Sequence, residues 1–175
     1  PENGVVRVPG GSVRDLDLSA LPAGVYGVEV TADVPVVAGA MVERRRDGGG
    51  VADLAWLSSA AALGDRQHVL GVAGASVGQQ TLTAVLALTA PKGDASLELV
   101  SGTATPASVR VRAGTTTVVT VPADQATFLR AATGSGPVVA ARLLTAATPQ
   151  GDLVTGASLR PAPVVQHLTA LAPGS

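Results

Sequence analysis

The chain has 175 residues, of which 46% are hydrophobic and 14% are charged, and its formal net charge at pH 7 is -1. This length provides one sizeable core or two small ones, and the hydrophobic content excludes a disordered tail. The small net charge gives no electrostatic field for binding nucleic acid, so we expect no nucleic-acid partner. The absence of cysteine excludes disulfides, thiolate zinc sites and cysteine nucleophiles. No uninterrupted apolar stretch reaches the roughly 18 residues of a membrane helix, so we expect no membrane insertion of this chain.

Alternation of β-branched and polar residues predicts strands along most of the chain. It is clear in VYGVEVTADV (Val25–Val34), ASLELVS (Ala95–Ser101) and TTTVVTVP (Thr115–Pro122). Gly- and Pro-rich turns separate these runs, at the spacing typical of a β-sandwich. DLAWLSSAAAL (Asp53–Leu63) fits either a helix or a strand with a loop, and the repeat described below favours a strand over Leu54–Leu57.

Two apolar octets of similar sequence lie about a hundred residues apart. They are PVVAGAMV (Pro35–Val42) and PVVAARLL (Pro137–Leu144), and each predicts a central sandwich strand. Chance would make them two unrelated strands, whereas a duplication would fix the architecture. Further matches keep the same order and favour duplication. These are VRVPGG with VRVRAG, Asp53-Leu54 with Asp152-Leu153, and Gln67-His68 with Gln166-His167.

We therefore predict tandem Ig-like or fibronectin-like β-sandwich units, a partial first unit over residues 1–73 and a second over residues 74–175. The second copy has QTLTAVLALTAPKGDASLELVSG (Gln80–Gly102) before its VRV, which we expect to form a hairpin around the turn at Pro91–Asp94. The first copy has only PENGV there, so we expect a unit incomplete at its N-terminus, in a fragment or at the end of a longer array. Its open sheet edge should share strands with a neighbour or pair with something outside the chain.

The segments LTAVLALTAPKGDASLEL, V-x-V-x-x-G and PVVAGAMV…DLAWL also carry a family resemblance. On them the chain resembles DUF5719, a family of unknown function in actinobacterial cell-envelope proteins, over most of its length. The resemblance implies export from the cytoplasm, β-rich domains and no established catalytic activity. It assigns no functional residues.

GASVG (Gly74–Gly78) matches the G-x-S-x-G pattern that surrounds the nucleophilic serine of α/β-hydrolases. Aspartates and His167 follow Ser76 in the hydrolase order. The pattern requires a helix after the serine, however, and a strand-like run follows Gly78. A glycine-rich linker is therefore our interpretation, and a serine esterase using Ser76 is the least favoured function.

The two Gln-His pairs lie in apolar runs without carboxylates or further histidines at ligand spacing, so we expect structural histidines and no metal. Asp53 and Asp152 are expected to bond backbone N–H groups at strand starts. No residue pattern predicts a cofactor.

The candidate partner-binding residues are Arg44, Arg45, Arg46 and Trp56. ERRRDGGG (Glu43–Gly50) contains the arginines, which suit a phosphate or an anionic glycan, although flanking acids also suit a solvated hairpin tip. Trp56 is either a surface platform or, as we expect, a core residue. Tyr26 and Phe128 occupy near-equivalent places in the repeat and are expected in the core.

These patterns favour a non-enzymatic, extracytoplasmic β-sandwich module, a structural or interaction domain of a bacterial cell-envelope protein. The alternative is a binding module for a cell-wall glycan or another envelope protein, acting through the 43–50 loop and the open sheet edge.

Overall fold

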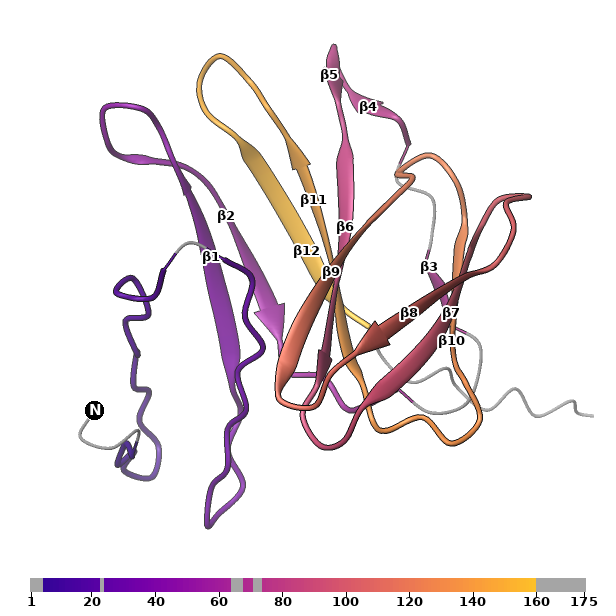
Figure 1. Cartoon of the computed structure of the whole chain (residues 1–175). Coiled ribbons are helices and arrows are strands. Elements are labelled where there is room, and N and C mark those ends of the chain that lie inside the picture. Colours follow the sequence, from indigo (N-terminus) through magenta and orange to yellow (C-terminus); the bar gives the residue numbers. More distant parts are fainter. Residues whose placement is uncertain (1–4, 23, 64–67, 71–73, 160–175) are drawn as a thin grey trace, which may run out of the picture.

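The computed structural model describes residues 5–22, 24–63, 68–70 and 74–159 (Figure 1). These residues form strands and no helix, which confirms the all-β class. The strands are β1 (Gly39–Arg45), β2 (Val51–Ser58), β3 (His68–Leu70), β4 (Ser76–Val77), β5 (Gln80–Thr81), β6 (Thr83–Ala90), β7 (Ala95–Ser101), β8 (Ala107–Val111), β9 (Thr115–Val121), β10 (Thr127–Ala131), β11 (Val139–Ala146) and β12 (Leu153–Ser158).

Two antiparallel four-stranded sheets form a sandwich. One has the strand order β3-β10-β7-β8 and the other β12-β11-β6-β9. Alternate residues of the inner strands face each other across the sandwich, because side chains in a strand point to opposite faces in turn. The largest fully buried side chains of this core are Leu86, Leu88, Leu97, Leu129, Val111 and Val138.

The strands predicted at Ala95–Ser101 and Thr115–Pro122 are confirmed as β7 and β9. The hairpin predicted over Gln80–Gly102 is wrong, because β6 and β7 belong to different sheets. The turn between them carries the chain from one sheet to the other, so that Leu86 and Leu97 both face the shared core. Asp94 fixes this turn, since its Oδ1 accepts a hydrogen bond from Ala113 N at 2.8 Å and its carbonyl accepts one from Gly136 N at 2.9 Å.

The N-terminal part has a different structure. No strand forms in the described residues before Gly39, so the strand predicted at Val25–Val34 is wrong. Extended backbone becomes a strand only when a neighbour supplies backbone hydrogen-bond partners, and within the described chain no backbone-to-backbone hydrogen bond joins residues 25–34 to another segment. The central position predicted for the first octet is also wrong. Within the described chain β1 pairs only with β2, whereas β11, which contains most of the second octet, lies between β12 and β6.

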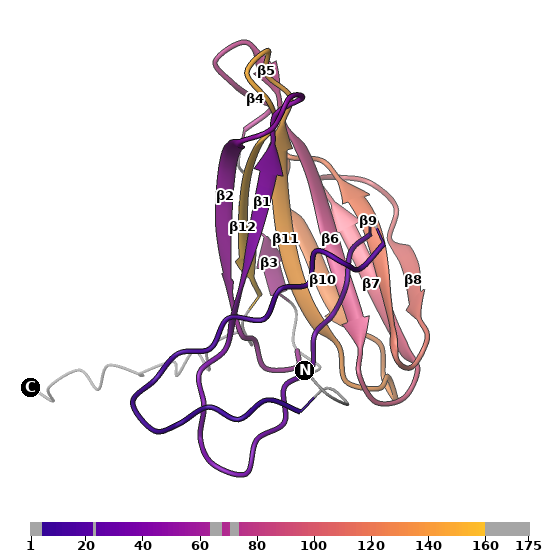
Figure 2. The same ribbon diagram turned by 90° about the vertical axis from the view of Figure 1, so that its left-hand side faces the viewer.

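β1 and β2 form a hairpin that packs as a third layer on β12, as the two views show (Figure 1, Figure 2). The strand predicted at Leu54–Leu57 is confirmed within β2. Both octets thus lead into the first strand of an antiparallel hairpin, β1–β2 for Pro35–Val42 and β11–β12 for Pro137–Leu144.

The sandwich also includes segments from the first predicted unit. β3 pairs with β10. Leu63 is buried in the core, and its N–H donates a hydrogen bond to the Val138 carbonyl at 2.7 Å. The described residues form one two-sheet sandwich with an attached hairpin. The tandem Ig-like arrangement and the boundary at residue 73 stay predictions.

Candidate docking surface

The β1–β2 hairpin has one covered and one exposed face. Residues directly opposite each other on paired strands share a face. Ala55 is buried and its β1 partner is Val42, so these two mark the covered face. Met41 lies opposite Trp56 and both are exposed, so they mark the other face.

The covered face packs on β12, and β2 runs parallel to that strand. Val154 N donates a hydrogen bond to Asp53 Oδ2 at 2.8 Å, and Ser158 Oγ donates one to the Ser58 carbonyl. Between these two bonds, Leu57 lies against Gly156 so closely that a Cβ on the glycine would be 2.9 Å from Leu57 Cδ2. The absence of a side chain at Gly156 therefore permits the approach of the two strands.

Asp53 bridges the two hairpins as a carboxylate. It accepts hydrogen bonds from Val154 N and from its neighbour Leu54 N, both at 2.8 Å. These two backbone donors favour the charged form and lower the pKa of Asp53 below its usual value. The prediction that Asp53 bonds backbone N–H groups is confirmed. Asp152, its predicted counterpart, makes no side-chain hydrogen bond within the described part of the chain.

The exposed face carries apolar side chains beside the charged Glu43. The side chain of Trp56 is 64% exposed, and Leu54 and Met41 beside it are about half exposed. The core position expected for Trp56 is therefore wrong, because the hairpin turns this face away from the sandwich. An open groove of about 490 Å³ lies where the hairpin meets β12, lined by Val37–Gly39, Trp56–Ser58 and Gly156–Ser158. Val37, at its rim, is 99% exposed.

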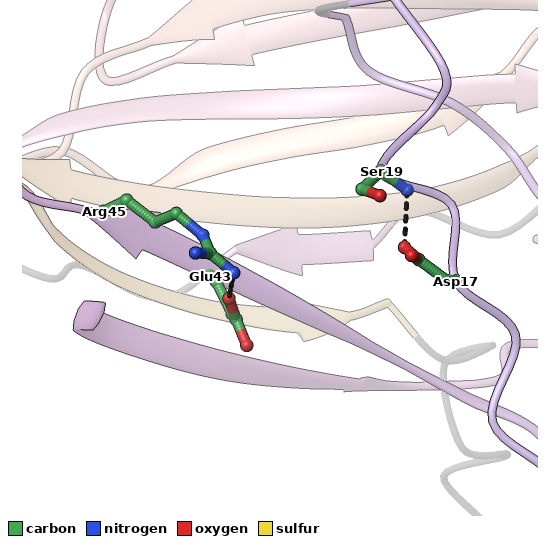
Figure 3. A network of polar contacts seen from close by, with 4 residues as sticks. All are labelled: Asp17, Ser19, Glu43 and Arg45. Atoms are coloured by element: carbon green, nitrogen blue, oxygen red, sulfur yellow. Dashed lines mark hydrogen bonds and ion pairs between the residues drawn. The ribbon is translucent and has the colours of Figure 1, made fainter. Parts of the chain in front are cut away.

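The three arginines predicted as a contact cluster lie in different environments. Arg44 is opposite Asp53 on the covered face and is only partly exposed. Arg45 pairs with Glu43 at 2.9 Å on the exposed side (Figure 3). Arg46 lies in the turn, where its N–H bonds the Gly50 carbonyl. The arginines therefore do not present one common surface.

The segment before β1 lies within electrostatic reach of the hairpin. Asp17 Oδ1 accepts a hydrogen bond from Ser19 N at 2.8 Å (Figure 3). This backbone bond is the main cause that lowers the pKa of Asp17. A bond with the Ser19 side chain and the positive charge of Arg45 lower it further. No hydrogen bond joins this part of the described chain to β1.

Further along, the N-terminal segment rests on the sandwich. Gly27 N donates to Thr116 Oγ1 at 3.0 Å, and Thr116 shares a hydrogen bond with Thr89. Gly27 lies directly against the Thr89 side chain, so a larger residue there would collide with it. Tyr26, next to it, is 49% exposed, and its expected core position is wrong. Phe128 in β10 is partly buried.

The other candidate residues form no site within the described residues. Ser76 is exposed in β4, which pairs with β5 in a two-stranded sheet, so no strand-to-helix elbow surrounds it. His68 lies in β3, and His167 and the Gln residues before both histidines fall outside the described residues. No group of three or more His, Asp or Glu side chains suited to a metal ion occurs among the residues described. Nor does that part of the chain hold a helix able to cross a membrane.

A family model of unknown function, DUF5719, matches residues 1–122. The chain belongs to this family. The DUF5719 match includes the N-terminal segment, the β1–β2 hairpin and the sandwich as far as the end of β9. No curated protein and no solved structure matches the chain.

The exposed apolar surface could not be predicted from the residue types alone. The first octet and Trp56 look like core sequence, but Met41 and Trp56 lie on the surface because the β1–β2 hairpin packs its other face on β12. The available signal was the repeat. It matches the two octets, and among the described residues β11 is paired on both sides whereas β1 is paired on one.

Proposed function

We propose that this DUF5719 chain is a non-enzymatic, extracytoplasmic module that serves as a structural or interaction domain of a cell-envelope protein. The observation that carries the proposal is the distribution of exposed apolar side chains. Among the described residues, all the large ones lie between Val5 and Trp56, except Val77, Val118 and Leu153. The sandwich thus packs its own apolar residues, whereas the N-terminal part leaves them exposed. Contiguous exposed apolar surface marks interaction sites in soluble proteins.

The test is co-sedimentation of the purified chain with bacterial envelope fractions. We expect the chain to pellet, and the single variants Trp56→Ser and Met41→Ser to bind at least tenfold more weakly, the order of effect of losing a buried aromatic anchor. Val118→Ser is the matched control, because Val118 is an exposed apolar residue of the sandwich. No pelleting, or equal pelleting of all three variants, would refute the proposal.

A second candidate is binding to a cell-wall glycan. The exposed Trp56 supports it, since an indole ring is a suitable platform for a sugar. Purified sacculi, sedimented at low and moderate salt, test it. Glycan binding through the 43–50 loop requires salt-sensitive pelleting that is lost on charge reversal of Arg44, Arg45 and Arg46. Pelleting that is lost only in Trp56→Ser would assign binding to the ring, and no pelleting would exclude this candidate.

A further inference from the structure

The two hairpins use equivalent backbone bonds. Ser59 N donates to the Ala38 carbonyl at 3.2 Å, and Leu159 N donates to the Ala140 carbonyl at 2.8 Å. Both alanines follow Pro-Val-Val in their octets. The hairpins therefore superpose with Ala38 on Ala140, which places Gly39, Met41 and Glu43 on Ala141, Leu143 and Thr145.

In the sandwich, these positions of β11 bind the next strand. Alternate residues of an antiparallel strand direct their N–H and C=O groups to opposite sides. Ala140 bonds toward β12, so Ala141, Leu143 and Thr145 face β6. Their partners there are Ala87, Val85 and Thr83.

On β1 the same side is open. Because Ala38 bonds toward β2, the N–H and C=O groups of Gly39, Met41 and Glu43 point away from it. No other strand pairs with β1 in the described part of the chain. This edge presents three backbone positions in the geometry that receives β6 elsewhere in the same molecule.

We propose that the β1 edge receives one extended segment of a partner protein, which adds antiparallel to β1 and follows the small-aliphatic pattern of β6, TAVLALTA. This inference rests on the proposed interaction role and names the partner's chemistry. Residues matching Ala87, Val85 and Thr83 of β6 lie opposite Gly39, Met41 and Glu43. Backbone bonds supply affinity, and the alternating side chains supply register.

The segment before β1 corresponds in sequence to the strand that would pair with the other edge of the added strand. VRVPGG corresponds to VRVRAG, so the residues that follow Gly11 correspond to β9, which pairs with β6 on the edge opposite to β11. In the first copy these residues form no strand, and Val13, Leu16 and Leu18 are exposed. A strand inserted beside β1 supplies the neighbour that they lack.

Two other occupants fit less well. The β6 strand of a second copy is already paired on both edges, with β9 and β11, so a copy cannot donate it without opening its sandwich. Nor can a second hairpin stack on the exposed face as β1–β2 stacks on β12. Gly156 permits that approach, and it lies opposite Leu143 in β11. In the β1–β2 hairpin, Met41 takes the place of Leu143, and Trp56, which lies opposite Met41, takes the place of Gly156. The indole occupies the space that the stacked strand needs.

The test is calorimetric titration of the full chain with a synthetic peptide of residues 79–93, whose sequence contains β6. We expect binding to the chain and to Met41→Thr, which keeps the edge N–H. We expect at least a tenfold loss of affinity for Met41→Pro, which removes that N–H while leaving the bonds to β2 intact. The matched control peptide is N-methylated at the residue equivalent to Val85, and it should bind at least tenfold more weakly.

No binding of the unmodified peptide overturns the proposal, as does equal binding to Met41→Pro or of the N-methylated peptide. Concentration-dependent dimerisation of the chain that Met41→Pro abolishes would assign the edge to a second copy instead. Envelope binding that depends on Trp56 tests the proposed function separately, so that function stands if the peptide alone fails.

Discussion

Replacing Gly156 with alanine tests how the β1–β2 hairpin is attached. The new Cβ would lie 2.8 Å from Leu143 Cδ2 and 2.9 Å from Leu57 Cδ2, well inside the ordinary carbon contact of about 3.5 Å. Overpacking of this kind costs about 1–3 kcal/mol. We therefore expect Gly156→Ala to lower the free energy of unfolding by that amount, measured by urea denaturation.

The companion variant Leu57→Ala isolates the contact between the strands. Alone it should cost about 1–2 kcal/mol, less than a fully buried leucine, because Leu57 is only partly buried. In the double variant the Leu57 methyl groups are gone, so part of the collision is relieved. The summed cost of the two single variants should therefore exceed the cost of the double variant. The difference should be larger than the roughly 0.5 kcal/mol within which independent sites add. Additive costs, or a harmless Gly156→Ala, would show that β2 does not pack on β12 as described.

Four further outcomes are expected. Leu129→Ala should lower the free energy of unfolding by about 2–5 kcal/mol in urea denaturation, because Leu129 is fully buried; Val118→Ala, at an exposed position, should cost far less, and equal costs would contradict the assigned core. The lowered pKa of Asp53 means that its charged form stabilises the fold above the unfolded value of 3.8 and that this contribution is lost as the pH falls through the lower folded pKa. The stability gap between the native chain and Asp53→Asn, followed by denaturation at several pH values, should therefore shrink below about pH 4, and a constant gap would exclude the bridging carboxylate. Ser76→Ala should leave hydrolysis of p-nitrophenyl acetate unchanged at the background rate, whereas serine-dependent turnover would restore the esterase hypothesis. Trp56 is the only tryptophan, so its fluorescence should be quenched by acrylamide almost as in the unfolded chain, and strong shielding would contradict the exposed hairpin face.

Local sequence patterns predicted the strands that have partners. TTTVVTV and ASLELVS alternate as half-buried strands do, and both form strands in the sandwich. The same alternation in VYGVEVTADV produced no strand. The difference is not local, because a strand depends on hydrogen bonds from a neighbour that can lie anywhere along the chain.

Long-range placement was the part that residue patterns could not supply. The turn at Pro91–Asp94 suits a hairpin as well as a crossing between sheets, and only the packing of Leu86 against the opposite sheet distinguishes the two. Trp56 was expected in the core because large aromatic residues are usually covered. It is exposed because its hairpin offers its other face to β12. The bridging role of Asp53 was predicted as a backbone contact, but its partner Val154 was not.

Amide hydrogen exchange along β1 tests the open edge most directly. In the free chain, the amides of Ala40 and Val42, which bond toward β2, should exchange slowly. The amides of Gly39, Met41 and Glu43 should exchange fast, because their side of the strand is unpaired. We therefore expect fast and slow exchange to alternate within this one strand. Slow exchange at all five positions would show that the edge is already covered in the free chain and would contradict this expectation.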